Sequence, residues 1–356
     1  MKKLPQKSNR TVTVQQIAEY ANVSLGTVSH VLNDSVAVSE ARRKRVLEAV
    51  KTLGYQRNQL ARGLRRSATT MLGMLIPDIG NPFFPGIVRG AEDIAYKHGY
   101  RLVLCNTDDD ANKEISYLND LRSFFPAGLL IIPAVGSALL ENLRHSDPAI
   151  TFVDRCPEGW EGDFVMADNE DGAYQAGRHL LELGHRRIAV ITGPHHLSNV
   201  AARLGGFTRA LAEAGIKLDS GLVQEAWFNT NSGYVAAKRL LEMLPRPTAI
   251  FASNDLLASG ALSAAHNLGL RCPADVSIVG FDDLEFVEHT APPLTTVHQS
   301  GYQIGETACR ILIERIDDPS RHPVRVILPT AIKIRSSTGR LQSAAKKRAG
   351  RNQVSS

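Results

Sequence analysis

Seven short apolar runs, separated by polar and helix-forming stretches, constrain the fold of the long central part of the chain. The runs are MLGMLIPD, RLVLCN, GLLIIPA, AITFVDR, RRIAVITG, TAIFASND and VSIVGFDD. Strands that are buried on both faces are near-continuous apolar runs, and parallel neighbours need helical connections such as GIVRGAEDIAYKHG. The pattern therefore predicts an α/β body with two doubly wound parallel-sheet lobes.

Polar residues directly follow three of these runs. Asp154 and Arg155 follow TFV, Asn254 and Asp255 follow IFAS, and Asp282 and Asp283 follow IVGF. Ligands of open parallel sheets bind beyond the carboxyl ends of the strands. We therefore expect a polar ligand cleft at these positions.

The first 56 residues have the spacing of a small helical unit. Asn22 can adopt the left-handed backbone of a tight turn, and Ser24 can cap the helix after it through its hydroxyl. The expected inward positions are Val14, Ile17, Ala18 and Ala21 on the first helix, Leu25, Val28, Val31 and Leu32 on the second, and Val46, Val50 and Leu53 on a third that begins near Ser39. This arrangement predicts a helix-turn-helix, whose second helix enters the DNA major groove.

The opposite face of the second helix carries small and polar residues, namely Gly26, Ser29, His30 and Asn33. Such a face can lie close to base edges, and His30 can donate a hydrogen bond to guanine N7 or O6. The basic run over 42–45 is suited to phosphates, which position a protein without reading sequence. The alternative is a helical protein-binding module with a surface histidine.

Charge is distributed unevenly along the chain. Residues 1–66 contain thirteen Lys and Arg against four Asp and Glu, and the chain from Arg335 onward contains six basic residues and no acidic one. Since the total is +5, the middle carries −10. A basic head on an acidic body indicates a polyanion partner for the head; solvated surface charge is the alternative.

Several other classes of protein find no support in the sequence. The four cysteines have no C-x-x-C or metal-ligand spacing, so we expect buried reduced thiols and no metal. The start lacks the apolar core of a signal peptide, and no run approaches the ~20 residues of a membrane span. No nucleotide-binding, hydrolase or metalloprotease motif is found. We expect a cytoplasmic protein that is not an enzyme and needs no cofactor.

The segment GYQRNQLARGLRRSATT joins head and body. Asn58 could cap one short helix carrying Leu60 and Leu64, but Gly63 costs about 1 kcal/mol of helix stability relative to alanine. An isolated helix this short is marginal in water. We therefore expect a helix that forms on a partner; a plain flexible linker is the alternative.

The sequence closely resembles the LacI/GalR (lactose-repressor) family of bacterial transcription regulators. The resemblance rests on VQQIAEYANVSLGTVSHVLN, LGY and NQLARGL, and it continues to near Ser337; TVSHV is most similar to the purine-repressor branch. It implies base reading at positions matching Leu25, Gly26 and His30, and paired hinge helices whose leucine, matching Leu64, wedges into the minor groove. The family usually has proline where Arg57 stands. The expected DNA contacts are Leu25, Gly26, Thr27, Ser29, His30, Asn33, Arg57, Asn58 and Leu64.

The resemblance also implies a body similar to type I periplasmic sugar-binding proteins, with lobes that exchange strands. The expected units are a head over 1–56, a hinge over 57–70, a body over 71–340 with lobes 71–168 plus 299–326 and 169–297 plus 329–340, and a basic disordered tail over 341–356. The implied cleft residues are Asn81, Phe83, Phe84, Asp154, Arg155, Arg203, Phe228, Asn254 and Asp282. Structural roles remain open for these residues: Asp154 or Asp282 could cap a helix, and Phe83 and Phe84 could be core.

The chemistry of the cleft favours a carbohydrate-like effector. Aromatic faces cover the apolar side of a sugar ring, while Asp, Asn and Arg bind its hydroxyls. The purine-binding branch has an arginine where Leu197 stands, which disfavours a purine, so a sugar or sugar-derived acid is expected. The prediction is a homodimeric repressor of a near-palindromic DNA operator. The alternatives are a nonspecific DNA-binding protein and a cytoplasmic sugar-binding protein with a protein-interaction head.

Overall fold

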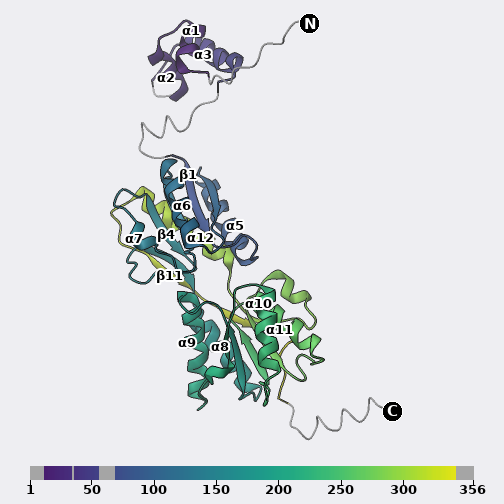
Figure 1. The fold of residues 1–356 in the computed structure, drawn as a ribbon. Helices are drawn as coiled ribbons and strands as arrows, with labels where there is room; N and C mark the ends of the chain where they lie inside the picture. Colours follow the sequence, from purple (N-terminus) through teal and green to yellow (C-terminus); the bar gives the residue numbers. More distant parts are fainter. Residues whose placement is uncertain (1–11, 34–35, 56–68, 342–356) are drawn as a thin grey trace, which may run out of the picture. The chain divides into compact units, whose positions relative to one another are not determined.

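The computed structural model describes residues 12–33, 36–55 and 69–341. The chain divides into two compact units, a head and a body, with the boundary after Ser67 (Figure 1). Residues 57–68 of the expected hinge and residues 342–356 of the expected tail lie outside the described part. Within the described part, no helix is long and apolar enough to cross a membrane.

The head is a three-helix unit with its own apolar core. Its helices are α1 (Val14–Ala21), α2 (Leu25–Asn33) and α3 (Glu40–Leu53). Ile17, Val28 and Val46, one from each helix, are fully buried. Each helix thus contributes to one core, which fixes the angle between α1 and α2.

The body contains two six-stranded sheets. In the first the order is β11-β5-β4-β3-β1-β2, and in the second it is β12-β10-β9-β8-β6-β7. The first comprises β1 (Met71–Ile76), β2 (Arg101–Asn106), β3 (Gly128–Ile131), β4 (Ala149–Val153), β5 (Asp163–Ala167) and β11 (Arg325–Leu328). The second comprises β6 (Ile188–Thr192), β7 (Val223–Glu225), β8 (Ala249–Ala252), β9 (Ser277–Asp282), β10 (Thr295–His298) and β12 (Ala331–Lys333). All described pairings are parallel except that of β12 with β10, so the fold class is confirmed with one antiparallel edge strand.

Helices cover both faces of each sheet. The first lobe, built on the first sheet, has α5 (Phe83–Lys97) and α12 (Gly301–Asp317) on one face and α6 (Ala111–Ser123) and α7 (Leu139–Asn142) on the other. The second lobe pairs α8 (Asn169–Glu182) with α9 (Ser198–Glu213) and α10 (Thr230–Leu241) with α11 (Asp255–Asn267). Two short 3₁₀ helices, Ser220–Leu222 and Glu285–His289, complete it.

Glycines allow α5 and α12 to pack closely. A Cβ at Gly90 would lie 2.0 Å from the carbonyl oxygen of Tyr302, and one at Gly305 would lie 1.9 Å from that of Ile87. Any larger residue would push the helices apart. This contact attaches α12, which is late in the sequence, to the first lobe.

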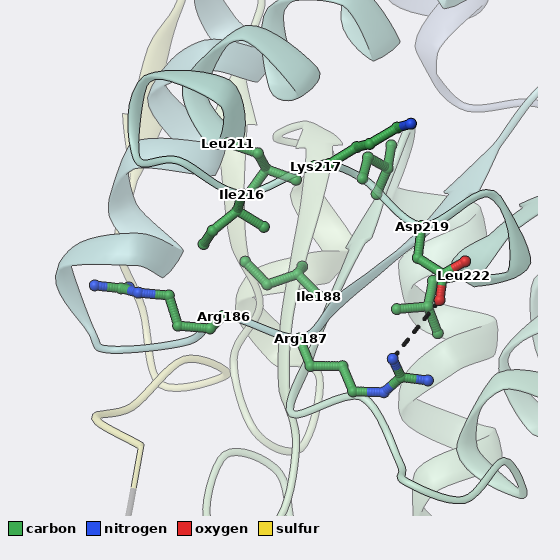
Figure 2. Close-up of a pocket in the computed structure, with 9 residues that line it drawn as sticks. Arg186, Arg187, Ile188, Leu211, Ile216, Lys217, Asp219 and Leu222 are labelled. Atoms are coloured by element: carbon green, nitrogen blue, oxygen red, sulfur yellow. Dashed lines mark ion pairs between the residues drawn. The ribbon is translucent and has the colours of Figure 1, made fainter.

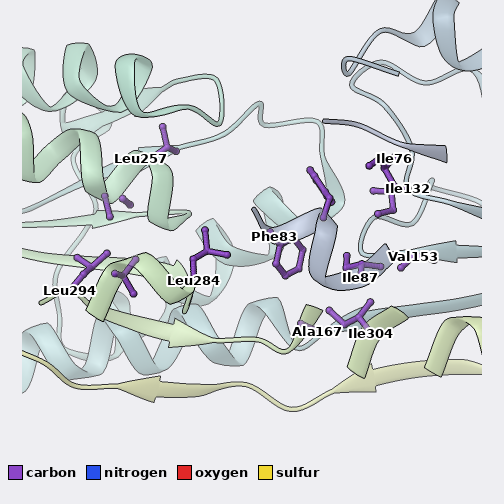
Figure 3. Packing of buried hydrophobic residues seen from close by; sticks show 14 of the residues in the cluster. Ile76, Phe83, Ile87, Ile132, Val153, Ala167, Leu257, Leu284, Leu294 and Ile304 are labelled. Atoms are coloured by element: carbon purple, nitrogen blue, oxygen red, sulfur yellow. The ribbon is translucent and has the colours of Figure 1, made fainter. Parts of the chain in front are cut away.

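The chain crosses between the lobes three times, at residue 168, at 299–300 and at 329–330. One apolar cluster also continues from one lobe to the other. Figure 3 shows Phe83 of the first lobe between Ile87 and Leu284, the latter from the second lobe. The lobes therefore meet through both backbone and core.

The prediction that all four cysteines are buried needs one correction. Cys309 is buried, but Cys105, Cys156 and Cys272 are only half-buried, so the expectation of four buried thiols is wrong for these three. All four are free thiols. Among the described residues, no cluster of His, Cys, Asp and Glu has the arrangement of a metal site.

Candidate functional site

The turn between α1 and α2 forms as the sequence predicts. Asn22 has a φ of 50°, and the amide of Val23 donates to the carbonyl oxygen of Ala18 over 3.0 Å. The hydroxyl of Ser24 accepts from the amide of Thr27 over 3.1 Å, which satisfies a donor at the start of α2. Short polar residues thus set the direction in which α2 leaves the turn.

The outer face of α2 is open at its first turns. Val28 and Val31 are buried, whereas Gly26 and His30 are exposed and Ser29 is half-buried. Leu25 is 53% exposed, so its assignment to the inward stripe is wrong. A helical side chain points toward the N-terminus of its helix, and at the first position of α2 this direction leads past the head core. Leu25, Gly26, Thr27, Ser29 and His30 therefore share the accessible start of the helix.

The remaining predicted DNA contacts are not placed by the structure. Arg57, Asn58 and Leu64 lie outside the described residues, and the backbone of Asn33 ends α2. The basic run Arg42–Arg45 lies on α3, and all four of its side chains are exposed. This exposure agrees with contacts to phosphates, which need no shaped pocket.

In the body, Arg203 of α9 lies against two carboxylates from strand ends. Its Nη1 is 3.6 Å from Oδ1 of Asp282, the last residue of β9. Asp154, directly after β4, interacts electrostatically with the same guanidinium. The three side chains are at most 4% exposed. The strand ends therefore bring together side chains from both lobes.

The backbone is strained where the two carboxylates are held. Asp154 has a φ of 61°, Asp282 a φ of 114° and Asp283 a φ of 59°. Residues other than glycine rarely adopt positive φ, and such strain concentrates at functional sites. Neither Asp154 nor Asp282 caps a helix in the described elements. The helix-capping alternative for these two residues is therefore wrong.

Burial shifts the titration of the cleft carboxyls. Burial raises the pKa of Asp282 to about 7, although Arg203 and the amide of Gln299 oppose this shift. Burial also raises the pKa of Asp154, again against the attraction of Arg203. Ionisation is disfavoured in low dielectric surroundings. Burial therefore favours the protonated form of both carboxyls, against the attraction of Arg203.

The first lobe contributes a second group of predicted residues. The side-chain oxygen of Asn81 accepts from the amide of Phe83 over 3.1 Å, at the start of α5. The rings of Phe83 and Phe84 meet edge to face, with centroids 5.7 Å apart. Arg155 lies 5.8 Å from the centre of the Phe84 ring and donates to Asp109 over 2.8 Å. Both phenylalanines are buried in the core cluster, so they have the structural role that the sequence left open.

Two predicted residues of the second lobe have clear local roles. The side-chain oxygen of Asn254 accepts from the amide of Leu257 over 2.9 Å and caps α11. The ring of Phe228 covers Gly193, where a Cβ would lie 2.2 Å from the ring. Phe228 is half-buried, so part of the ring remains accessible. The structure thus places Asn254 as a cap and Phe228 as an aromatic surface at the end of β7.

Sequence reasoning missed four polar residues that surround Arg203, Asp154 and Asp282. Asn169 accepts from Arg203 Nε over 2.7 Å, and the Ser253 carbonyl oxygen accepts from Nη1 over 2.5 Å. Asn199 donates to Asp154 over 3.1 Å, and Gln299 donates to Asp282 over 2.6 Å. Gln299 follows the strand run TTVH, so the strand-end rule could have found it; Asn169 and Asn199 lie at helix starts, where no pattern distinguishes them.

A separate pocket of about 220 Å³ lies elsewhere in the second lobe. Its lining includes Arg186, Arg187 and Lys217 around an apolar floor with Ile188. Figure 2 shows that the three cationic ends point in different directions, and Arg187 is 3.7 Å from Asp219. Since these charges do not converge, the polar cluster around Arg203 and not this pocket is the candidate ligand site.

Comparisons with known proteins identify both parts of the chain. Residues 13–58 match the bacterial regulatory proteins of the lacI family, and residues 178–338 match a periplasmic binding protein-like domain. The HTH-type transcriptional repressor PurR of Aliivibrio salmonicida is 38% identical over 308 residues, which cover 86% of this chain and 92% of the relative. The chain belongs to the LacI family.

Solved structures of transcription regulators match almost the whole chain. A lac repressor dimer bound to operator and the anti-inducer ONPF matches with a TM-score of 0.82 and 27% identity, covering 93% of this chain and 100% of that one. A complex of the transcriptional regulator CelR with cellobiose matches with a TM-score of 0.71 and 32% identity, covering 92% and 99%. This LacI-family chain is a DNA-binding transcriptional repressor under allosteric control, and the expected resemblance to the purine-repressor branch is confirmed.

Proposed function

We propose that this LacI-family repressor reads a near-palindromic operator as a homodimer and that a small effector in the cleft of the body controls its affinity. The observation that carries the proposal is the direct bonding of the cleft side chains Arg203 and Asp282 to the segments that connect the lobes. An effector that contacts these side chains acts on the parts of the chain that move when the lobes change their angle.

The proposed reading surface is the exposed start of α2. Leu25, Gly26, Thr27, Ser29 and His30 are its base-reading and positioning residues, with Asn33, Arg57, Asn58 and Leu64 as further contacts. Exposure of Leu25 and His30 supports direct contact with base edges, because both side chains are accessible at the start of α2. A single head covers little DNA surface, so two-fold symmetry supplies the selectivity.

The proposed effector site is formed by Asn81, Phe83, Phe84, Asp154, Arg155, Arg203, Phe228, Asn254 and Asp282. The dense polar bonding around Arg203 and the accessible ring of Phe228 support a sugar or sugar-derived acid. The CelR structure, in which the ligand is cellobiose, supports the same class. The buried Leu197 stands where the purine-binding branch is expected to have arginine, which weighs against a purine.

The coupling uses two of the three crossovers between the lobes. Asn169 begins α8 just after the first crossover and accepts from Arg203, while Gln299 forms the second crossover and donates to Asp282. Effector binding therefore changes how the lobes meet and, in a dimer, the spacing of the two hinges. Such coupling between sites is typically about 1–3 kcal/mol and acts equally in both directions.

The body serves as a sensor in this proposal and performs no reaction. The relatives are transcriptional regulators, and the cleft carboxylates are bonded to side chains that hold them in place. The protein acts where its DNA is, in the cytoplasm.

The test is selection from a pool of random DNA duplexes at near-physiological salt, followed by sequencing of the bound fraction. The expected result is a near-palindromic consensus, and the genes next to matching sites would narrow the effector. Binding without a consensus would instead favour a nonspecific DNA-binding protein. Absence of binding would favour a sugar-binding protein with a protein-interaction head.

A further inference from the structure

The buried groups of the cleft carry more negative than positive charge. Asp154, Asp255 and Asp282 are at most 4% exposed, and Arg203 is the guanidinium that acts on all three. One guanidinium balances one carboxylate. The three carboxyls therefore cannot all be ionised without excess negative charge in a dry site.

Asp255, which ends a strand run but is not among the cleft residues that the family resemblance implies, contributes to this excess. Its Oδ1 accepts from the Thr296 hydroxyl over 2.6 Å and its Oδ2 accepts from the Leu284 amide over 2.9 Å. Both partners are neutral. Burial raises the pKa of Asp255, and the neighbouring Asp282 raises it further.

Arg155 does not remove the imbalance. Its Nη1 is 2.8 Å from Asp109, and it also attracts Asp154, but one guanidinium cannot balance both carboxylates. Glu114 is also close, fully buried, and bonded to the amide of Ala134 and the hydroxyl of Ser137. Arg155 thus has the carboxyls of Asp109, Glu114 and Asp154 near its one guanidinium.

Two buried acceptor atoms in this cluster have no hydrogen-bond partner in the described structure, namely Oδ1 of Asp154 and Oε1 of Gln299. The two residues are 2% and 3% exposed. The other oxygen of Asp154 is held by Asn199, and the amide nitrogen of Gln299 is held by Asp282, so both unpaired atoms belong to the Arg203 cluster. Buried acceptors without partners are costly, and a ligand that donates hydrogen bonds would satisfy them.

We infer that the effector of this repressor is uncharged or positively charged and enters the cleft as a hydrogen-bond donor to Asp154 and Gln299. This inference rests on the proposed effector site. It narrows the proposed class of effector, because it excludes the sugar-derived acids. A carboxylate or phosphate would add negative charge next to Asp154, Asp255 and Asp282. A hydroxyl or ammonium group would supply the missing donors and reduce the repulsion.

The first test needs no ligand and measures the unfolding free energy of the full-length chain at pH 8. If the buried carboxylates exceed the positive charge that balances them, removing one charge should stabilise the fold. Asp282→Asn keeps the size of the side chain and removes its charge, so the variant should be more stable than wild type. Asp154→Asn should change stability in the same direction and serves as the second variant. A loss of stability in both variants at pH 8 would overturn the inference.

Asp163→Asn is the matched control. Asp163 is equally buried but is bonded to both Arg315 and Arg321 and accepts from the amide of Val324. Removing this charge leaves two guanidiniums without their carboxylate, so the control should be less stable than wild type. The opposite signs expected for Asp282→Asn and Asp163→Asn separate excess charge from a general effect of the substitution.

The second test uses charge-matched probes, namely D-glucose, D-glucosamine and D-glucuronate with the corresponding galactose series, titrated by calorimetry into wild type and Asp282→Asn. Neutral or amino members should bind wild type at least about tenfold more tightly than their uronates, and the substitution should reduce this preference. Tighter binding of a uronate than of its neutral parent in wild type would overturn the inference. Failure of the proposed function would be seen separately, as absence of a selected operator.

Discussion

Nη1 of Arg203 lies 3.6 Å from Oδ1 of Asp282, and the same guanidinium stacks 3.8 Å from the ring centre of Phe281. The arginine is 3% exposed and the aspartate 4%, so water contributes little to stabilising their charges. The pair depends on the neutral groups around it, the carbonyl of Ser253 and the amides of Asn169 and Gln299. The stability of the body therefore depends on this pair, which also belongs to the proposed effector site.

Replacing Arg203 with methionine should destabilise the body by about 3 kcal/mol at pH 8, because Asp154 and Asp282 would lose their shared cation. The loss should be smaller at pH 5, where these carboxyls, whose pKa values burial raises, are more fully protonated. Urea denaturation at both pH values measures the effect. Arg209→Met is the control on the same helix: its exposed pair with Glu170 should be worth less than about 1 kcal/mol. An equal loss at both pH values would contradict this account.

Acid should weaken the attachment of the chain segment around Gly339. His185 is buried, and its ring nitrogens lie 3.0 Å from the Thr248 hydroxyl and 3.1 Å from the Gly339 carbonyl oxygen. Burial lowers the pKa of His185 below its ordinary value of 6.5, so the unfolded chain takes up the proton more readily. The contribution of His185 to stability is thus present above pH 6.5 and is lost as the pH falls through the folded-state pKa.

The measurement for His185 is the unfolding free energy of wild type and His185→Gln between pH 8 and 5. Wild type should be more stable than the variant by about 1 kcal/mol per lost hydrogen bond at pH 8, and the difference should shrink toward pH 5. His195→Gln is the control, at a histidine that is about half exposed. It should change the unfolding free energy little at pH 8 or at pH 5. A difference that stays constant over this range would count against the titration of His185.

His30→Ala should lower the preference for operator over random DNA by about 1–3 kcal/mol, because a base contact carries sequence information. Lys44→Ala, at an exposed residue of α3, should instead weaken binding to both DNAs about equally and reduce the salt dependence. Fluorescence anisotropy with both duplexes at two salt concentrations distinguishes the two behaviours. Equal losses on both DNAs for His30→Ala would refute its assignment as a base reader.

Truncation of Leu25 should affect DNA binding, whereas truncation of Val28, one turn away, should affect the stability of the head. Leu25 is 53% exposed, so Leu25→Ala should leave the head folded and weaken operator binding. Val28 is fully buried between the three head helices, and Val28→Ala should destabilise the head by about 1–3 kcal/mol. Amide hydrogen exchange of residues 14–53 in the full-length chain reports stability, and operator titration reports binding. Faster exchange in Leu25→Ala than in Val28→Ala would contradict the structure.

The sequence alone determined the elements that depend on local patterns. The helix-turn-helix follows from apolar spacing, from Asn22 in the turn and from Ser24 as the cap, and the structure shows each of these features. The doubly wound sheets follow from continuous apolar runs, since only strands covered on both faces have that composition. Asp154 and Asp282 could be found because they directly end such runs.

Tertiary structure decided what depends on packing between distant segments. The exposure of Leu25 could not be read from periodicity, because its spacing fits the apolar stripe and only the position of α1 and α3 leaves it outside the core. Phe83 and Phe84 were expected in the cleft, and only the structure shows that they also belong to the cluster that joins the lobes. Asn169, Asn199 and Gln299 are far apart in sequence and meet only because the chain crosses between the lobes. Charge balance in the cleft has the same origin, since the sum of buried charges is a property of the folded arrangement and not of any one segment.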